Sequence, residues 1–299
     1  MIFLAGIGWG TGGTWVTQMS KMGASSFLTG FTAHFFALPF LGTAILITKG
    51  WKGFKLTKRG LLFAVIMGIF TKGIFKMAYD TTVASVGVST GAVLLYTAPV
   101  FVAIMSMLVF KEKLYANNFL ALGMNLVGVF LMVTLGNLAN FNVSPLGIAV
   151  GFLAAFLHAS NTIMAKISGG SEDPLTMAFY MLVFSTILQG LISKPWTPTN
   201  LALLTDSTFL FWAVINAFIT GTVCNLLYLK GLSTNVDASK APIISSVEVI
   251  VATLMGVYIF SESMNFVGLV GMGLMLASIY LMNQEPKEFI GRELNEEVY

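Results

Sequence analysis

Charged side chains, histidine and cysteine are all scarce in this sequence. Its 299 residues include 16 Lys and Arg and 13 Asp and Glu, or 10% charged residues, against roughly 25% in an average soluble domain. The single cysteine, Cys224, excludes a disulfide within the chain, and the two histidines form no group with metal-site spacing. No G-x-x-x-x-G-K-[ST] phosphate loop is present, so ATP-driven pumping by this chain is unsupported. We predict no metal and no cofactor.

Apolar residues dominate what remains. They make up 56% of the chain, including 25 Phe and 17 Met, and the mean hydropathy is +0.85. A water-soluble domain of this length needs far more polar surface to stay dispersed, which argues against a soluble enzyme. The net charge of +3 is too small and too scattered to predict a nucleic-acid partner. The composition therefore indicates a protein whose main partner is the lipid bilayer.

Ten apolar runs are long enough to cross a hydrocarbon layer of about 30 Å at a helical rise of about 1.5 Å per residue. None alternates polar and apolar residues as outer-membrane strands do. The runs lie at residues 2–20, 26–48, 60–79, 83–110, 117–136, 145–166, 176–193, 208–229, 239–260 and 265–282. We predict an all-α, multi-pass protein of the cell membrane with ten transmembrane helices.

Basic residues are distributed unevenly between the two sides of these runs. If the N-terminus is cytoplasmic, the outer loops hold only Lys21 and Lys194. The inner loops and the tail hold Lys49, Lys52, Lys55, Lys58, Arg59, Lys111, Lys113, Lys166, Lys230, Lys240, Lys287 and Arg292. Because cytoplasmic loops carry an excess of Lys and Arg, both termini are predicted to be cytoplasmic.

A weak repeat relates the two halves of the chain. A shift of 150 residues superposes the ends of the apolar runs and several identical residues. It places Phe110 on Phe260, Glu112 on Glu262, Gly123 on Gly273 and Met132 on Met282. Five runs per half is an odd number, so the second half would cross in the opposite direction, as in the inverted repeats of many secondary transporters. The predicted units are residues 1–140, residues 141–282 and an acidic cytoplasmic tail at residues 283–299.

Several short motifs follow this repeat. The first half holds Gly8-Trp9-Gly10, AVLLYTAPVF at residues 92–101 and KEK at residues 111–113, and the second holds VEV at residues 247–249 and FSE at residues 260–262. With these motifs the chain resembles the EamA-type ten-span carriers of the drug/metabolite transporter superfamily, which include amino-acid exporters. The resemblance covers residues 1–282 and implies two five-helix repeats and transport of a small solute. Lys72 and Lys76 are unusual for the third span of that family.

Five polar or aromatic residues accompany one deep carboxylate, Glu248. Helical rise from the nearest ends places Glu248 and His158 about 12 Å below the cytoplasmic side, with Trp9 in the same layer. The same calculation places Lys72 and His34 about 12 Å below the outer side, near Tyr96. The sequence thus predicts two polar layers.

Charge at such depth needs a partner or a water-filled path. An ionised group facing lipid there costs about 2.5–3.5 kcal/mol on insertion scales, so these side chains should face a cavity or each other. We expect Glu248 to receive a cationic substrate group or to exchange a proton, and Lys72 to attract a carboxylate or phosphate. A structural ion pair is the alternative for both residues.

Four further residues are candidates for the same site: Lys76, Tyr79, Asn161 and Asn225. Lys76 lies four residues before Asp80 and could instead pair with it or extend towards the membrane surface. The two asparagines could simply hold helices together. Tyr79, like Trp9 and Tyr96 above, could serve packing rather than ligand binding.

Alternating access is the mechanism expected for such a chain. We predict a central cavity lined by the first, third, fourth, sixth, eighth and ninth runs, with Pro99 as a hinge because proline interrupts the helical hydrogen-bond ladder.

The leading function is a secondary carrier for a small polar or amphipathic metabolite, such as an amino acid, working as an exporter or as an exchanger coupled to a proton or counter-substrate. A nucleotide-sugar or sugar-phosphate exchanger is the alternative, since two membrane lysines suit phosphate. An intramembrane enzyme or a membrane scaffold is the alternative from another class, although His158 and Ser160, a candidate base and nucleophile, do not share a helix face. The chain could work as a monomer or homodimer.

Overall fold

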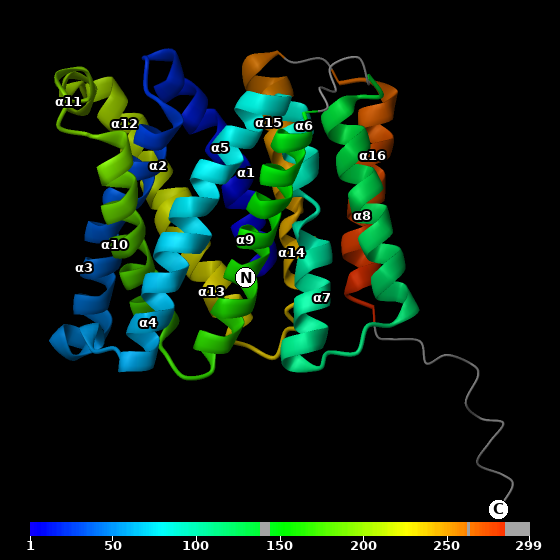
Figure 1. The fold of residues 1–299 in the computed structure, drawn as a ribbon, viewed down its shortest axis with the longest axis horizontal. Helices are drawn as coiled ribbons and strands as arrows, with labels where there is room; N and C mark the ends of the chain where they lie inside the picture. The colour runs from blue at the N-terminus through cyan, green and yellow to red at the C-terminus, as the bar shows by residue number, and fades with distance from the viewer. Residues whose placement is uncertain (138–143, 262–263, 285–299) are drawn as a thin grey trace, which may run out of the picture.

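The computed structural model describes residues 1–137, 144–261 and 264–284, and the described residues form helices and no strand. Figure 1 shows them as a bundle of roughly parallel and antiparallel helices. In chain order they are α1 (Ile2–Lys21), α2 (Ser26–Phe35), α3 (Ala37–Lys49), η1 (Gly50–Phe54), α4 (Lys58–Ile66), η2 (Met67–Ile74), α5 (Phe75–Val86), α6 (Val88–Leu95), α7 (Ala98–Phe110), α8 (Ala116–Thr134), α9 (Pro145–Gly169), α10 (Pro174–Ser193), α11 (Pro198–Thr205), α12 (Ser207–Asn216), η3 (Ala217–Cys224), α13 (Asn225–Leu232), α14 (Ala241–Ser245), α15 (Val247–Phe260) and α16 (Phe266–Met282). Most of the predicted tail lies outside the described residues.

Polar caps fix where many of these helices begin. The side chains of Ser25, Thr57, Asp173, Asp206 and Asn265 each accept a hydrogen bond from a backbone N–H in the first turn that follows. Proline occupies the first turn of helices α7, α9, α10, α11 and α14, where its missing N–H costs nothing. These caps supply the partners that helix ends otherwise lack.

Within the described residues, eight helical segments are long and apolar enough to cross a membrane, and large apolar side chains such as Ile47 (80% exposed) and Leu108 (76%) cover their outer faces. Such a surface is expected where lipid replaces water. The chain is therefore a multi-pass membrane protein. Of the two other predicted crossings, α16 has 17 residues, and α1 has 20 but is rich in glycine and threonine. The ten-span count remains a prediction.

The predicted boundary between the third and fourth runs is wrong. The third run was expected to end at residue 79, but the helical segment continues from Lys58 to Val86, and the fourth crossing begins at Thr90 rather than at residue 83. Asp80 does not end the helix because Lys76 and Ser26 satisfy its carboxylate. Lys72 consequently lies at the middle of its helix.

Backbone irregularities recur at the 150-residue offset found in the sequence. Two π-helical segments, η2 and η3, begin at Met67 and Ala217. The helix breaks that precede α7 and α15 are centred near Tyr96 and Ser246. Lys111 and Ser261 both end their helices with a φ of 55°. Among the repeat pairs, Glu262 lies outside the described residues, and the unit boundaries remain predictions.

The helices are arranged so that α1 lies inside the bundle. It packs against α15, η3 and α12, while α8 and α16 pack closely together at one edge (Figure 1). Helices α2 and α3 lie beside α10 at the other side. The two π-helical segments therefore approach a common central region, which positions the site described next.

Candidate functional site

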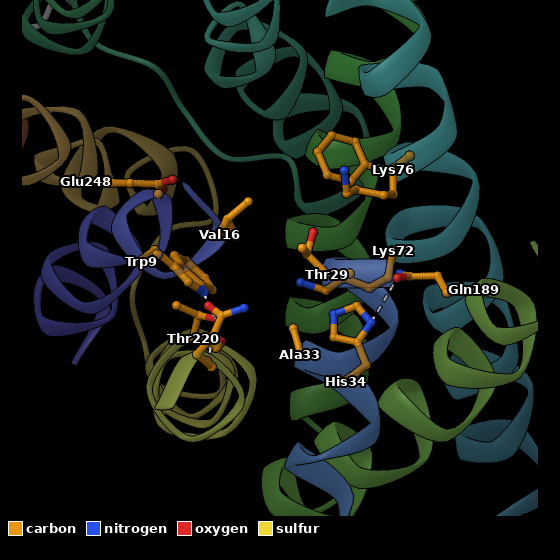
Figure 2. A pocket seen from close by; sticks show the side chains of 15 residues that line it. Trp9, Val16, Thr29, Ala33, His34, Lys72, Lys76, Gln189, Thr220 and Glu248 are labelled. Atoms are coloured by element: carbon orange, nitrogen blue, oxygen red, sulfur yellow. Dashed lines mark hydrogen bonds between the residues drawn. The ribbon is translucent and has the colours of Figure 1, made fainter. Parts of the chain in front are cut away.

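A cavity of about 310 Å³ lies between two groups of helices. Figure 2 shows Trp9, Val16, Thr220 and Glu248 on one side, from α1, η3 and α15, with the Glu248 carboxylate directed at the gap. The other side is formed by α2, η2, α5 and α10. Its labelled polar residues are Thr29, His34, Lys72, Lys76 and Gln189. Glycines 12, 13 and 30 also line the cavity, and at Gly13 the space that a Cβ would take is open, which leaves room for a solute.

Glu248 stands in the first turn of α15, directly after the break at Ser246. Its half-buried carboxylate makes no hydrogen bond or ion pair with any residue in the described part of the chain. It also lines a second, smaller cavity of about 50 Å³, together with Tyr96, Pro99 and His158. Glu248 is thus shared by two cavities. A carboxylate without a protein partner is available to a ligand or a proton.

Lys72 extends from the π-helical segment η2 across the cavity (Figure 2). Its Nζ donates to Asn225 Oδ1 over 3.0 Å and lies 5.9 Å from the centre of the Trp9 ring. Asn225 is fixed because its Nδ2 donates to the carbonyls of Thr220 and Gly221. No described carboxylate lies within 4.0 Å of Lys72. One of its three N–H donors is used, so this cation can receive an anionic group.

Lys76 behaves differently although it also lines the cavity. Its Nζ lies 2.5 Å from Asp80 Oδ1 as an ion pair one helical turn apart. The other carboxylate oxygen of Asp80 accepts a hydrogen bond from Ser26 Oγ over 2.6 Å. The alternative that Lys76 pairs with Asp80 therefore holds in this structure, and its charge is already balanced.

His34 is held in place by α10. Its Nδ1 lies 2.9 Å from Ser185 Oγ and 3.2 Å from Gln189 Nε2, and Gln189 Nε2 also donates to Ser185 Oγ. Gln189 is buried, so the orientation of the imidazole is fixed by α10 on the side of the ring away from the cavity. This arrangement leaves the rest of the ring facing the cavity (Figure 2), where its second nitrogen can contact a solute.

Of three further predicted residues, Trp9 lines the main cavity, whereas Asn161 and Tyr79 contact neighbouring side chains outside it. Trp9 donates its Nε1–H to Thr220 O over 3.3 Å and packs on Tyr228, which makes it a fixed wall. Asn161 accepts a hydrogen bond from Thr71 Oγ1 over 3.0 Å. Tyr79 stacks on Phe75 with ring centres 6.1 Å apart. Asn161 and Tyr79 line neither of the two cavities.

The prediction of two separate polar layers is wrong. Trp9 and Glu248, expected in the inner layer, share one cavity with Lys72 and His34, expected in the outer layer. Likewise Tyr96 lines the small cavity with His158. The expected depth of Lys72 rests on a third run that ends at residue 79, whereas the helix that carries Lys72 extends to Val86. The layers therefore merge near the middle of the bundle.

The predicted lining helices need correction as well. The second and seventh predicted runs line the main cavity through α2 and α10, in place of the fourth and sixth runs, which reach only the small cavity. Gln189, Thr29 and Asn216 were missed. Polar amides within apolar runs were the signal that could have found Gln189 and Asn216. The break near Pro99 lies at residues 96–97, with Pro99 in the first turn of α7; its role as a hinge remains a prediction.

Known proteins resemble this chain over nearly its whole length. The model of the EamA-like transporter family matches residues 1–134 and again residues 145–284. An uncharacterized transporter of Archaeoglobus fulgidus is 28% identical over 70% of this chain and 72% of its own. The uncharacterized inner membrane transporter YicL of Salmonella typhimurium is 24% identical over 96% and 95%. A crystal structure superposes with a TM-score of 0.79 at 13% identity, covering 94% of both chains, and this likeness concerns the fold alone.

Proposed function

Because the chain belongs to the EamA-like transporter family, we propose that it is a secondary carrier for a small zwitterionic metabolite, such as an amino acid, and works by alternating access. The observation that carries this proposal is the presence in one cavity of two opposite charges, neither of which forms an ion pair with a described residue. Lys72 has an amide as its partner, and Glu248 has no partner among the described residues. A zwitterion offers a carboxylate to the first and an ammonium group to the second.

The backbone arrangement supports two inverted five-helix repeats that would cross the membrane ten times, and the uneven distribution of Lys and Arg supports cytoplasmic termini. Features 150 residues apart recur in the two halves, and an odd number of crossings per half gives opposite orientations. The two halves would rock about a shared cavity, so that each side of the membrane gains access in turn. Export or exchange, with a proton or counter-substrate, fits such a cycle, in a monomer or a homodimer.

Polar links at one end support a conformation closed towards the predicted cytoplasm. Glu112, after α7, accepts hydrogen bonds from the backbone N–H of Ala238 over 2.7 Å and from the hydroxyl of Ser239 over 2.8 Å. Lys49 pairs with Asp173. The main cavity instead reaches Val16 and Lys76, towards the end of the molecule where α1 ends. A carrier needs both conformations at modest cost.

Amino-acid exchange in proteoliposomes tests the proposal. Vesicles loaded with a mixture of neutral amino acids are placed in the same mixture carrying isotope label, and exchange is measured by mass spectrometry. We expect wild-type protein to exchange at least one member, and Glu248→Gln and Lys72→Met each to reduce that exchange sharply because one charge of the zwitterion loses its partner. Glu172→Gln, at a carboxylate bonded to Thr57 outside the cavity, is the matched control.

The same assay can reject the proposal. Unchanged exchange by Glu248→Gln would remove this residue from the site. Exchange of nucleotide sugars or sugar phosphates, with amino acids ignored, would favour the anion exchanger instead. A loss of folded protein is recognised by size-exclusion chromatography before reconstitution.

A further inference from the structure

Two lysines one helical turn apart on the same helix have different partners at the cavity. Lys72 Nζ meets the neutral carbonyl of Asn225, whereas Lys76 Nζ meets the carboxylate of Asp80 at 2.5 Å. Both lysines line the main cavity, and Asp80 does not. Asp80 therefore stands behind Lys76 and does not itself face the cavity.

Asp80 is held firmly in this position. Its two oxygens have different partners, Lys76 on its own helix and the Ser26 hydroxyl at the start of α2. The side chains of Lys76 and Asp80 are 23% and 17% exposed, so water screens the pair only partly. At such a site an ion pair is retained because separating it leaves a poorly solvated charge.

The charged side chains at the cavity determine which solutes its net charge favours. Lys72, Lys76 and Glu248 line it, and Asp80 cancels Lys76. One cation and one anion remain without a charged partner. Without Asp80 the cavity would instead present two cations and one anion, the composition expected of a site for a phosphate ester or a dicarboxylate.

The geometry points to Asp80 as a specificity-determining residue that keeps multiply charged anions out of the cavity by neutralising Lys76. This inference rests on the proposed transport of zwitterions and extends it: Asp80 selects between two substrate classes without touching either. Ser26 serves Asp80 as a positioning group, because its hydroxyl fixes the second carboxylate oxygen.

Competing exchange of two probe sets tests the assignment. Proteoliposomes are offered labelled neutral amino acids and, separately, labelled sugar phosphates and dicarboxylates, and the ratio of the two exchange rates is measured. We expect Asp80→Asn to shift this ratio towards the anions by about tenfold, equivalent to about 1.4 kcal/mol. The double variant Lys76→Met/Asp80→Asn removes both charges and should return the ratio to the wild-type value.

Matched controls separate this effect from damage to the fold. Glu172→Gln removes a carboxylate that is hydrogen-bonded to Thr57 outside the cavity and should leave the ratio unchanged. Rescue by the double variant distinguishes charge balance from structural disruption, because a merely structural pair would stay broken. A ratio that does not move in Asp80→Asn, or wild-type protein that already exchanges anions as fast as amino acids, overturns the inference while amino-acid exchange stands. Wild-type protein that exchanges neither set overturns the proposed function and this inference together.

Discussion

The two halves of the molecule share a backbone plan and differ in charge. Each half has a π-helical segment and a broken helix, in positions 150 residues apart. Yet Lys72 in the first π-helical segment corresponds to Thr222 in the second, and Glu248 corresponds to Ala98 in the first half. Repetition of the backbone favours two equivalent conformations. The unequal charges then give the shared cavity a cationic and an anionic side, one from each half.

Reversing the charge of Lys72 or Glu248 should have the largest effect on transport. Lys72→Glu would place two acids in the cavity, and Glu248→Lys would place there two lysines without an ion-pair partner, beside the paired Lys76. Each single variant should reduce amino-acid exchange by about a hundredfold, because like charges in a poorly solvated site repel one another. The variant with both changes restores one charge of each sign and should recover part of the activity. Additive losses in the double variant would show that the two residues act independently.

Two of the buried asparagines, Asn225 and Asn161, offer a finer test. Asn225→Leu removes the acceptor that orients Lys72 and should raise the substrate concentration for half-maximal exchange about tenfold. Asn161→Leu removes only the acceptor of Thr71 between α9 and η2 and should lower stability by about 1 kcal/mol without changing that concentration. Exchange kinetics and thermal unfolding measure the two effects, and identical profiles for the variants would refute the distinction.

Glycines of α8 and α16 test where these two helices, one from each half, approach each other closely. A methyl group at Gly128 would lie 2.8 Å from Gly271 O, and one at Gly271 would lie 2.6 Å from Gly128 O. Gly128→Ala or Gly271→Ala should therefore destabilise the protein by about 2 kcal/mol. A methyl group added at Gly123, or at Gly273 in the other half, would have no described atom within 4 Å apart from its chain neighbours and its own helix backbone. Alanine there should leave the unfolding temperature unchanged; a fall equal to that of Gly128→Ala would contradict the packing described.

The link between Lys49 and Asp173 joins the halves outside the cavity and should have the smallest effect. Burial raises the pKa of Asp173, but hydrogen bonds from Lys49 and Thr176 outweigh it and hold the pKa below its ordinary value. The stabilisation is thus present above about pH 4, the ordinary Asp pKa, and is lost as the pH falls through the lowered pKa. Asp173→Asn should reduce stability slightly at pH 7, and the difference from wild type should vanish in strong acid. A difference that persists there would point to another cause.

Sequence reasoning identified the main charged residues but misjudged their arrangement. Glu248, Lys72, His34 and Trp9 were recognised because polar groups at depth are costly, and all four line the main cavity. The depth of Lys72 was miscounted because the third run was expected to end at residue 79, whereas the helix continues past Asp80 to Val86.

Other features left little trace in the sequence. The π-helical segments do not alter hydropathy, and Thr29 is a small uncharged residue of a kind that commonly occurs in membrane helices. Which helices line the cavity depends on tertiary packing of α2 and α10 around α1, and a single sequence does not encode that choice in any local pattern.

Chemical blocking of each substrate charge tests the central claim most directly. Proteoliposomes with wild-type protein are offered neutral amino acids, their N-acetyl derivatives and their methyl esters, each labelled, and exchange of the three sets is compared. If Lys72 and Glu248 each hold one charge of the solute, only the unmodified amino acids should exchange, because each derivative leaves one of these side chains without a partner. Exchange of either derivative at the rate of its parent would contradict that claim.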